Sequence, residues 1–478
     1  MGSIKKNFVY NSIYQILALI LPFITTPYIS RVLGAENIGV YSYTYSVAYY
    51  FVLVAMLGVN NYGNRSCARV RDDKFLLSKT FCEIYALQLI LSILSSVVYI
   101  SYVVLFSTVD IRIALYQTLY VLSAAFDINW FFFSIEKFKV TISRNLFVKL
   151  LTMILIFLCV KSEASLGIYT LIMAGGVLIS QIVVWPFLKK SIFFVKPKFR
   201  EIIKHLKPNI VLFVPAVAVS VYKYMDKIMI GTMSTMLEEG FYAQAEKIIQ
   251  IPLGFISALG TVMLPRMSNL VYNKRNEESK ELIYKSMLFI SFLSSALVFG
   301  LAGIASDFIP LFLGNGYDQC VDILVGLSFS VLFVAWANVI RTQYLIPQKK
   351  DSLYLITVVV GAIVNCTINL LLIKPFGAMG AVIGTIFAEA SVAVSQSILV
   401  RKELPIKSYL CNGIPFLFVG WLMFYFLTHI TFTNLAFLNL MIKIFFGGLL
   451  YLTVSAIIIW VFQRDILRSV ILVRRRKK

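Results

Sequence analysis

Charged residues are scarce in this chain: they make up 14% of its 478 residues, whereas hydrophobic residues make up 59%. Soluble domains contain about 25% charged residues and about 45–50% apolar ones. The mean hydropathy of +0.83 agrees with this bias. The composition excludes soluble globular, fibrous, disordered and secreted proteins, and it indicates a chain that crosses a membrane several times.

Histidine and cysteine are rare as well, with two and six residues, and the cysteines show no Cys-x-x-Cys spacing. Zinc and haem sites need several such ligands at short spacing, so no metal site is expected. The sequence also lacks a Walker A loop, a nucleophile elbow and paired catalytic carboxylates in a loop. An ATP-driven pump is therefore excluded, and the chain is not expected to be an enzyme.

Long apolar runs are the dominant feature of the sequence. A helix needs about 20 apolar residues to cross a bilayer. These runs predict an all-α polytopic membrane protein with about fourteen transmembrane helices, because β-barrel strands would be shorter and would alternate. The predicted spans are 8–33, 38–62, 80–106, 111–134, 141–160, 165–188, 208–232, 240–265, 282–305, 320–346, 353–373, 377–400, 412–431 and 440–462.

The basic residues lie predominantly on one predicted face. The N-terminus, the connections after even-numbered spans and the C-terminus carry 35 of the 44 Lys and Arg residues, and the opposite connections carry five. Under the positive-inside rule, this asymmetry predicts that both termini are cytoplasmic. The net charge of +21 then reflects topology and attraction to anionic lipid, so no nucleic-acid partner is expected.

Weak internal repeats divide the chain into two similar halves. An acidic residue followed by Gly-x-Tyr occurs in LGAENIGVY (33–41) and in IGTMSTMLEEGFY (230–242), about two hundred residues apart. Such repeats are typical of transporters. They predict two pseudo-symmetric six-helix lobes and a C-terminal pair of helices with a basic cytoplasmic tail. The expected boundaries are 1–200 for the N-lobe, 201–402 for the C-lobe and 403–478 for helices 13 and 14 with the tail.

Paired prolines mark the first predicted helix of each lobe. These are Pro22 and Pro27 in the first lobe, and Pro208 and Pro215 in the second. A proline inside a span frees a backbone carbonyl and weakens the helix locally. A static kink and a hinge for alternating access are both open interpretations, and the pairing makes all four prolines hinge candidates.

The seventh and eighth predicted spans contain ionisable residues, which are costly inside a bilayer and usually face a cavity or a partner. Lys223, Asp226 and Lys227 share one helix face, and Glu246 and Lys247 follow in the next span. One interpretation is mutual neutralisation with snorkelling lysines. The other is a cationic pocket for an anionic group such as a pyrophosphate.

Three further ionisable residues extend this set. Arg31 lies near the outer end of the first predicted span and could add a positive charge to a cationic pocket. Asp127 and Glu389 lie deeper in their spans without an obvious partner in the same helix. Either carboxylate could carry a coupling proton or form a hydrogen bond with a neighbouring helix.

The segments PYISRVLGAENIGVYSY (27–43), FDINWFFFSIEKFK (126–139) and DKIMIG…EEGFYAQAEKI (226–248), together with the six-plus-six-plus-two layout, carry a family resemblance. The chain resembles bacterial Wzx-type polysaccharide repeat-unit flippases, which transport O-antigen or capsule units. These proteins form the polysaccharide transporter branch of the multidrug/oligosaccharidyl-lipid/polysaccharide exporter superfamily. The resemblance covers essentially the full length.

This resemblance implies alternating access around a cationic cavity in the bacterial inner membrane. The expected substrate is an undecaprenyl-pyrophosphate-linked oligosaccharide, and the expected energy source is a proton or sodium gradient without a cofactor. Arg31, Lys223, Lys227 and Lys247 would hold the pyrophosphate, while Asp226 and Glu246 would orient these bases or take part in coupling. Membrane lipids, a polysaccharide polymerase and the chain-length and export machinery are the implied partners.

Two alternatives in the same superfamily stay open. One is the lipid II flippase of peptidoglycan synthesis, which also has fourteen spans and a cationic cavity. The other is a multidrug or cation antiporter, although such proteins usually have twelve spans and acidic cavities. A polysaccharide polymerase or ligase would belong to a different class, but it would need large extracytoplasmic loops that the predicted spans do not leave room for.

Overall fold

A computed structural model describes residues 2–107 and 109–462 of the chain, and these residues form helices and no strands. Side chains are described for the same residues except 2–20, 138, 215, 219, 222, 223 and 462. The chain divides into two compact units, which we call unit 1 (Met1–Ala243) and unit 2 (Gln244–Lys478). The lobe boundaries expected from the repeats, 1–200 and 201–402, remain a prediction.

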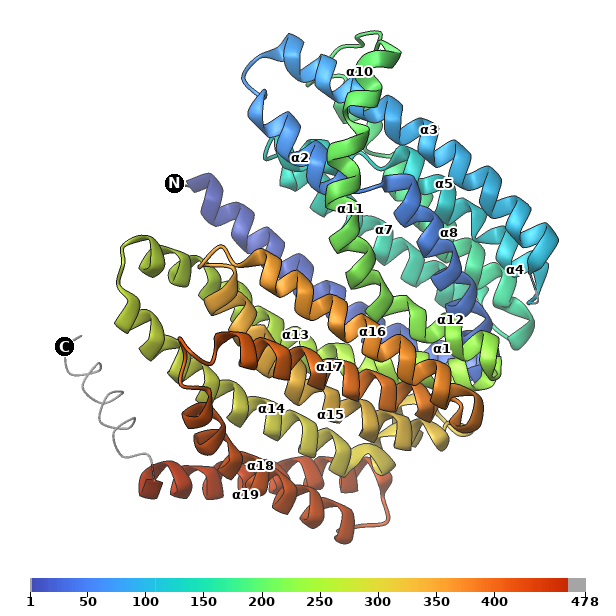
Figure 1. Ribbon diagram of the computed structural model, residues 1–478. Coiled ribbons are helices and arrows are strands. Elements are labelled where there is room, and N and C mark those ends of the chain that lie inside the picture. The colour runs from blue at the N-terminus through green and yellow to red at the C-terminus, as the bar shows by residue number, and fades with distance from the viewer. Residues whose placement is uncertain (1, 108, 463–478) are drawn as a thin grey trace. The chain divides into compact units, whose positions relative to one another are not determined.

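Unit 1 contains most of the first seven predicted spans, coloured blue to green in Figure 1. Helices α3, α5 and α7 pack against α1, and α8 packs against α5 and α7. Its helices are α1 (Gly2–Met56), α2 (Val59–Arg69), α3 (Lys74–Phe106), α4 (Ile111–Tyr116), α5 (Thr118–Phe126), α6 (Asn129–Ser134), α7 (Phe138–Cys159), η1 (Glu163–Ser165), α8 (Leu166–Ile182), α9 (Trp185–Leu188), α10 (Phe199–Lys204), α11 (Leu206–Ser220), η2 (Val221–Met225), α12 (Asp226–Met233) and the start of α13 (Met236–Tyr272).

Unit 2 begins inside α13 and contains the remaining helices. These are α14 (Asn276–Leu313), α15 (Gln319–Ile340), η3 (Arg341–Leu345), α16 (Asp351–Phe376), α17 (Ala378–Val400), α18 (Ile406–His429) and α19 (Ala436–Phe462). Helix α14 packs against α15, α18 and α19, and α17 packs against α15 and α16. Because these segments are helices, their backbone N–H and C=O groups form hydrogen bonds within each segment, as a lipid environment requires.

Twelve segments of the described residues are long and apolar enough to cross a membrane. The chain is therefore a multi-pass membrane protein, although the predicted number of fourteen spans is not confirmed. One segment, Leu21–Arg69, includes most of the predicted spans 8–33 and 38–62. The predicted span 208–232 is not among the twelve, and its helix is divided into α11, η2 and α12.

A single glycine lies where the chain turns between the first two predicted spans, both of which lie largely in α1. Helix α1 continues through both, but its backbone leaves helical geometry at Gly34, where φ is 76° and ψ is 166°. Glycine accepts a positive φ without the steric cost that a side chain would add. The chain therefore turns between the two spans over one residue, and no separate loop is needed.

The predicted span 111–134 is interrupted near its C-terminal end. Asp127 follows α5 in an extended conformation, with φ −76° and ψ 100°. Its Oδ1 atom accepts hydrogen bonds from the backbone N–H and the side-chain amide of Asn129, at 3.0 and 2.7 Å. Short polar side chains that bond to nearby backbone compete with helix hydrogen bonds, which explains the break before α6.

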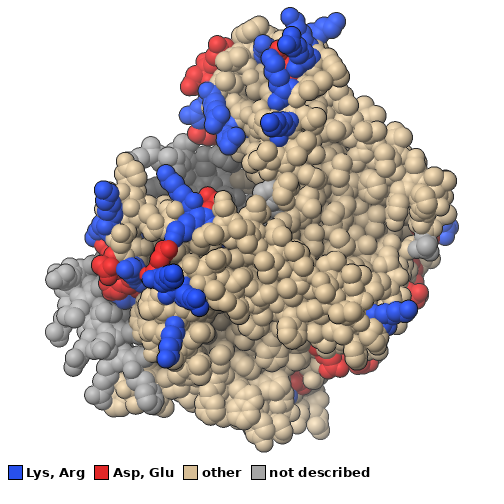
Figure 2. All heavy atoms as spheres, in the orientation of Figure 1, with Lys and Arg blue, Asp and Glu red and all other residues tan. Residues whose placement is uncertain are grey.

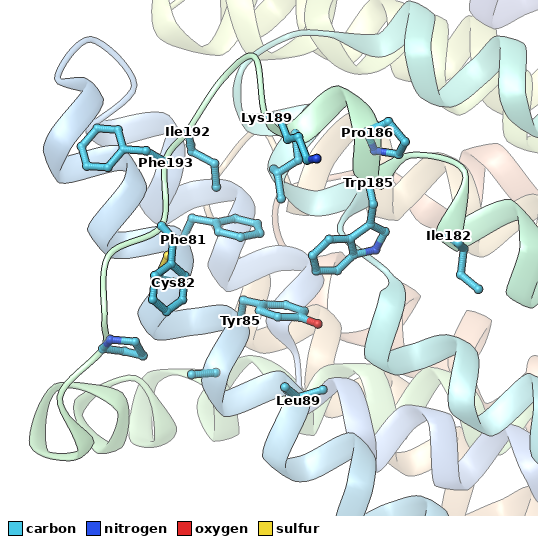
Figure 3. A pocket seen from close by; sticks show the side chains of 14 residues that line it. Phe81, Cys82, Tyr85, Leu89, Ile182, Trp185, Pro186, Lys189, Ile192 and Phe193 are labelled. Carbon is cyan, nitrogen blue, oxygen red and sulfur yellow. The ribbon is translucent and has the colours of Figure 1, made fainter.

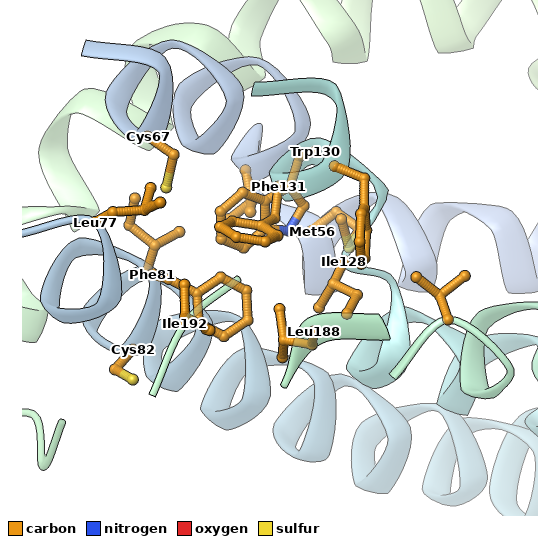
Figure 4. Close-up of a cluster of buried hydrophobic side chains, with 14 of the residues drawn as sticks. Met56, Cys67, Leu77, Phe81, Cys82, Ile128, Trp130, Phe131, Leu188 and Ile192 are labelled. Carbon is orange, nitrogen blue, oxygen red and sulfur yellow. The ribbon is translucent and has the colours of Figure 1, made fainter. Parts of the chain in front are cut away.

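One hydrophobic cluster of unit 1 contains Trp130 (Figure 4). This indole is 1% exposed and stacks on Phe81 at 5.4 Å. Its Nε1–H group donates to Gln88 Oε1 at 3.0 Å, and the Gln88 amide donates to the carbonyls of Ala124 and Asp127. A buried tryptophan that is fully hydrogen-bonded stabilises a core strongly. Trp130 therefore fixes α6 against α3.

The last two helices are integral parts of unit 2. Phe299 of α14 lies in one hydrophobic cluster with Met423 of α18 and Tyr451 of α19. Lys443 of α19 also forms an ion pair with Asp307 of α14 at 2.7 Å, and the Lys443 side chain is 7% exposed. A buried, paired charge of this kind favours one helix register.

Basic side chains gather at one end of unit 1. Figure 2 shows Lys and Arg residues concentrated over α10 and the connection between α2 and α3. Two of these charges are paired locally: Arg71 contacts Glu136 at 2.6 Å, and Lys204 contacts Glu201 at 2.8 Å. The hydrogen bond to Glu136 raises the pKa of Arg71, which lies outside the membrane-spanning segments.

Candidate functional site

A π-helical turn lies at the centre of the charged segment that the sequence singled out. Residues Val221–Met225 form this turn, η2, between α11 and α12. Such turns occur frequently at functional sites because they shift the helix face that follows. Lys223 lies in the turn, although its side chain is outside the described part of the structure.

Asp226 begins the helix after this turn and is 2% exposed. The Tyr242 hydroxyl donates a hydrogen bond to Asp226 Oδ2 at 2.8 Å. Tyr242 is the tyrosine of the second Gly-x-Tyr motif. This hydrogen bond joins α12 to the start of α13 and gives the buried carboxyl group of Asp226 a partner.

Lys227 follows Asp226 and is half-buried. Its Nζ atom lies 5.9 Å from the ring centre of Tyr224, within the range of a cation–π interaction. The Tyr224 ring stacks on Tyr49 of α1, with the centroids 3.8 Å apart. The cationic segment is thus joined to an aromatic surface of the same unit.

This aromatic surface is a row of tyrosines that we call the tyrosine column. It starts with Tyr41, Tyr45 and Tyr49, which are spaced four residues apart and share one face of α1. The column consists of these three residues with Tyr120, Tyr169 and Tyr224 from α5, α8 and η2. Four members are half-buried, while Tyr120 and Tyr169 are buried.

The stacking distances within the column are short. Tyr45 stacks on Tyr120 with centroids 4.8 Å apart, and its hydroxyl lies 3.3 Å from the Tyr120 hydroxyl. Tyr41 meets the edge of Tyr169 at 4.7 Å. These contacts restrict the rings to one arrangement, so the column presents fixed apolar faces with hydroxyl groups at their edges.

Arg31 and Lys247, two other predicted pyrophosphate ligands, each form a hydrogen bond within their own helix. Arg31 of α1 is exposed, and its guanidinium donates to the Pro27 carbonyl at 3.0 Å. Lys247 is exposed, donates to Gln244 Oε1 at 3.1 Å and belongs to unit 2 together with half-buried Glu246. The structure therefore brings Asp226 and Lys227 together in unit 1 and describes Lys247 and Glu246 as part of the other unit.

Asp127 belongs to a separate group of polar side chains in unit 1. Asn129 bonds to Asp127 and also donates to Gln181 at 3.0 Å. Arg144, which is 7% exposed, donates to Asn129 Oδ1 at 2.9 Å and to Asn145 Oδ1 at 2.6 Å. Asp127 thus accepts hydrogen bonds from Asn129 and belongs to a network that the sequence did not reveal, because its members come from three segments of chain, 127–129, 144–145 and 181.

The remaining candidates lie in α1, α11 and α17. Glu389 is half-buried in α17. Pro22 and Pro27 lie inside α1 before the break at Gly34. The other pair, Pro208 and Pro215, lies inside α11 before the π-helical turn. In both predicted lobes, a proline pair thus precedes an interruption of the first helix.

The sequence did not predict the tyrosine column as a unit. The segment YSYTYSVAYY (41–50) contains the relevant spacing, but tyrosine is also common at membrane interfaces and in cores. Spacing identifies the members on α1, whereas Tyr120, Tyr169 and Tyr224 join through tertiary packing. Among the described residues, no group of three His, Cys, Asp or Glu side chains could hold a metal ion.

Comparison with known proteins places the chain among polysaccharide transporters. It is 24% identical over 395 residues to an O-antigen transporter of Shigella dysenteriae, covering 82% of this chain and 98% of the relative. It is also 24% identical over 308 residues to the low-salt glycan biosynthesis flippase Agl15 of Haloferax volcanii, covering 63% of each protein. These relatives are transporters, in agreement with the expectation that the chain is not an enzyme.

The fold has a counterpart among solved structures. The lipid II flippase MurJ in its inward closed conformation superposes with a TM-score of 0.74 at 18% identity, covering 96% of this chain and all of that one. Residues 4–271, more than half of the chain, match the family described as polysaccharide biosynthesis protein. The chain therefore belongs to the polysaccharide biosynthesis protein family of multi-pass membrane transporters.

Proposed function

We propose that this protein flips lipid-linked oligosaccharide repeat units across the bacterial inner membrane for surface polysaccharide synthesis. The observation that carries the proposal is the juxtaposition of Lys227 with the tyrosine column in unit 1. A lipid-linked oligosaccharide carries a pyrophosphate and several sugar rings. The site offers a group suited to each of these parts.

The basic residues are proposed to hold the pyrophosphate. Lysine and arginine form strong charge-assisted hydrogen bonds with phosphate oxygens. Lys227 is proposed to act with Lys223, which lies one helical turn before it, and Arg31 and Lys247 are proposed to complete the set. Undecaprenyl pyrophosphate is the expected carrier, with its lipid tail remaining in the bilayer.

The tyrosine column is proposed to contact the sugars. A pyranose ring has a face of C–H groups and a rim of hydroxyls, and tyrosine provides an apolar ring face with a hydroxyl at its edge. Rigid aromatic residues lose little conformational entropy when they bind. Because the rings of Tyr45 and Tyr49 are already fixed by stacking, they are suited to this role.

Transport is proposed to occur by ion-coupled alternating access, driven by a proton or sodium gradient. Asp226 and Glu246 are the first candidates for coupling, and Asp127 and Glu389 are the second pair. A proton or cation on one of these carboxylates would change which conformation is favoured. The two proline pairs are proposed hinges, because each precedes a break in its helix.

The proposed orientation places both termini in the cytoplasm. The basis is the one-sided distribution of Lys and Arg, which also appears as the basic end of unit 1 in Figure 2. In this orientation, the flippase would collect its substrate at the inner leaflet. A polysaccharide polymerase and chain-length or export machinery are the proposed partners on the outer side.

A lipid analysis of a deletion strain tests the function. We expect undecaprenyl pyrophosphate carrying a complete repeat unit to accumulate, and surface polymer to disappear. Plasmid-borne wild-type protein should reverse both effects. Accumulated lipid II would contradict the proposal and indicate peptidoglycan synthesis, whereas unchanged lipids with altered drug sensitivity would indicate an antiporter.

A further inference from the structure

A deep apolar groove lies at the basic end of unit 1, away from the tyrosine column. It has a volume of about 690 Å³ and runs between α3, α9 and the chain that follows α9. Figure 3 shows Phe81, Tyr85 and Trp185 around it, with Lys189 beside Trp185 and Pro186. None of the proposed substrate ligands lines this groove.

One wall of the groove is a non-helical segment, residues 191–198, that is fixed to α3. The backbone N–H of Phe193 donates to Ser78 Oγ at 3.2 Å, and that of Val195 donates to Cys82 Sγ at 3.5 Å. Lys137 also donates to Ser191 Oγ at 2.9 Å. Since these bonds hold the wall in place, the groove is preformed and does not depend on a ligand to shape it.

The segment that forms this wall carries charge of one sign. The segment WPFLKKSIFFVKPKFR (185–200) contains Lys189, Lys190, Lys196, Lys198 and Arg200 and no acidic residue. The next carboxylate in the chain, Glu201, accepts a hydrogen bond from Lys204. This hydrogen bond lowers the pKa of Glu201. A surplus of positive charge therefore remains at the groove.

Exposed aromatic side chains accompany these lysines. Phe194 is 82% exposed, although it is large and apolar. Such residues next to lysines are typical of the membrane interface, where the ring enters the lipid and the ammonium meets the head groups. The groove thus combines an apolar floor, which is suited to acyl chains, with a basic edge, which is suited to phosphates.

We propose that this groove binds an anionic phospholipid of the cytoplasmic leaflet. One acyl chain lies along Tyr85, Leu89 and Trp185. The phosphate is held by Lys189, which lines the groove, and by Lys190, the next residue in the chain. Basic pockets between helices on the cytoplasmic side are suited to anionic head groups. This site is additional to the proposed substrate site, and it depends on the proposed function only for the orientation of the chain.

Native mass spectrometry of the purified full-length protein tests the site with dioleoylphosphatidylglycerol as the probe. We expect a tight binding step that is about tenfold weaker in the Lys189→Gln/Lys190→Gln variant, because two charge-assisted contacts are lost. The matched control is Lys402→Gln, which removes a basic residue elsewhere. Zwitterionic phosphatidylethanolamine should bind the wild type about tenfold more weakly. Equal phosphatidylglycerol binding by the double variant and the wild type would overturn the proposal.

A second measurement tests the apolar part of the groove. Phosphatidylglycerol with brominated acyl chains should quench Trp185 fluorescence, and Trp185→Phe should remove that quenched component. Ala86→Trp should block the groove, whereas Leu94→Trp, an exposed α3 position outside it, should not. Undecaprenyl phosphate that binds here about tenfold more tightly than phosphatidylglycerol would also overturn the proposal. Both readouts are independent of transport, so failure of the flippase proposal would leave them interpretable.

Discussion

Gly39 and Gly240 lie face to face where α1 crosses the start of α13. A Cβ atom on Gly39 would lie 1.7 Å from the Met236 carbonyl oxygen, and one on Gly240 would lie 1.9 Å from the Ala35 carbonyl oxygen. Both residues are the glycines of the repeated Gly-x-Tyr motifs. The repeats therefore meet in unit 1 as a helix crossing with backbone in direct contact, a geometry that only small residues allow.

The first prediction concerns this crossing. Gly39→Ala and Gly240→Ala should each destabilise the protein by about 1–3 kcal/mol, because the added methyl group must push the two backbones apart. The thermal midpoint of the purified protein measures the effect. Gly448→Ala is the control, since no atom lies within 4 Å of its Cβ position. Equal midpoints for Gly39→Ala and Gly448→Ala would show that the crossing tolerates side chains.

The second prediction concerns the proposed pyrophosphate ligands. Lys223→Ala combined with Lys227→Ala should reduce polysaccharide export by at least about tenfold, as expected for the loss of two contacts to a charged group. Protein abundance in the membrane should not change. Surface polymer in the complemented deletion strain provides the measurement, with Lys374→Ala as a control at an exposed lysine of unit 2. Normal export by the double variant would refute a cationic pocket.

The third prediction concerns the hydrogen bond between Tyr242 and Asp226. Tyr242→Phe should lower the free energy of unfolding by about 1–3 kcal/mol, since it removes a donor to a buried carboxylate. Asp226→Asn should have a similar effect. The two changes together should cost less than the sum of their separate effects, with a coupling of about 0.5–3 kcal/mol in a double-mutant cycle. Additive costs would mean that the hydroxyl and the carboxyl group act independently.

The fourth prediction concerns the tyrosine column. Tyr49→Ala should reduce export while Tyr49→Phe should retain much of it, because the phenylalanine preserves the stacked ring beside Tyr224. Tyr272→Ala is the control, because Tyr272 is 85% exposed, and the variant protein should support normal export. The readout is surface polymer normalised to protein abundance. If Tyr49→Ala matches Tyr272→Ala, the column has a structural role and no role in sugar binding.

Local sequence patterns predicted much of the architecture. Hydropathy located eleven of the twelve apolar segments one by one, since a membrane-spanning helix is specified by about 20 consecutive residues. It could not predict that the spans 8–33 and 38–62 join through Gly34, because a positive φ depends on surroundings as well as on residue type. The π-helical turn at Val221–Met225 was missed for a similar reason, since it leaves the sequence pattern of a helix unchanged.

The candidate site was also predicted only in part. The sequence identified Asp226 and Lys227 as unusual because ionisable residues inside a span are costly. It did not identify Tyr242 as the donor to Asp226, and it missed the contact between Tyr224 and Tyr49, which are far apart in the chain. Partners of this kind are chosen by packing between helices, which a one-dimensional pattern does not encode.

The sequence by itself determined that the protein is helical and spans a membrane many times, and it predicts that most of the positive charge lies on one side. These properties follow from the transfer of individual side chains between water and lipid, which composition and order specify. Only the tertiary structure decided that Gly39 meets Gly240, that six tyrosines form one column and that a lysine-edged groove opens beside α3. The physical reason is that helices in lipid associate through close packing and hydrogen bonds between distant segments.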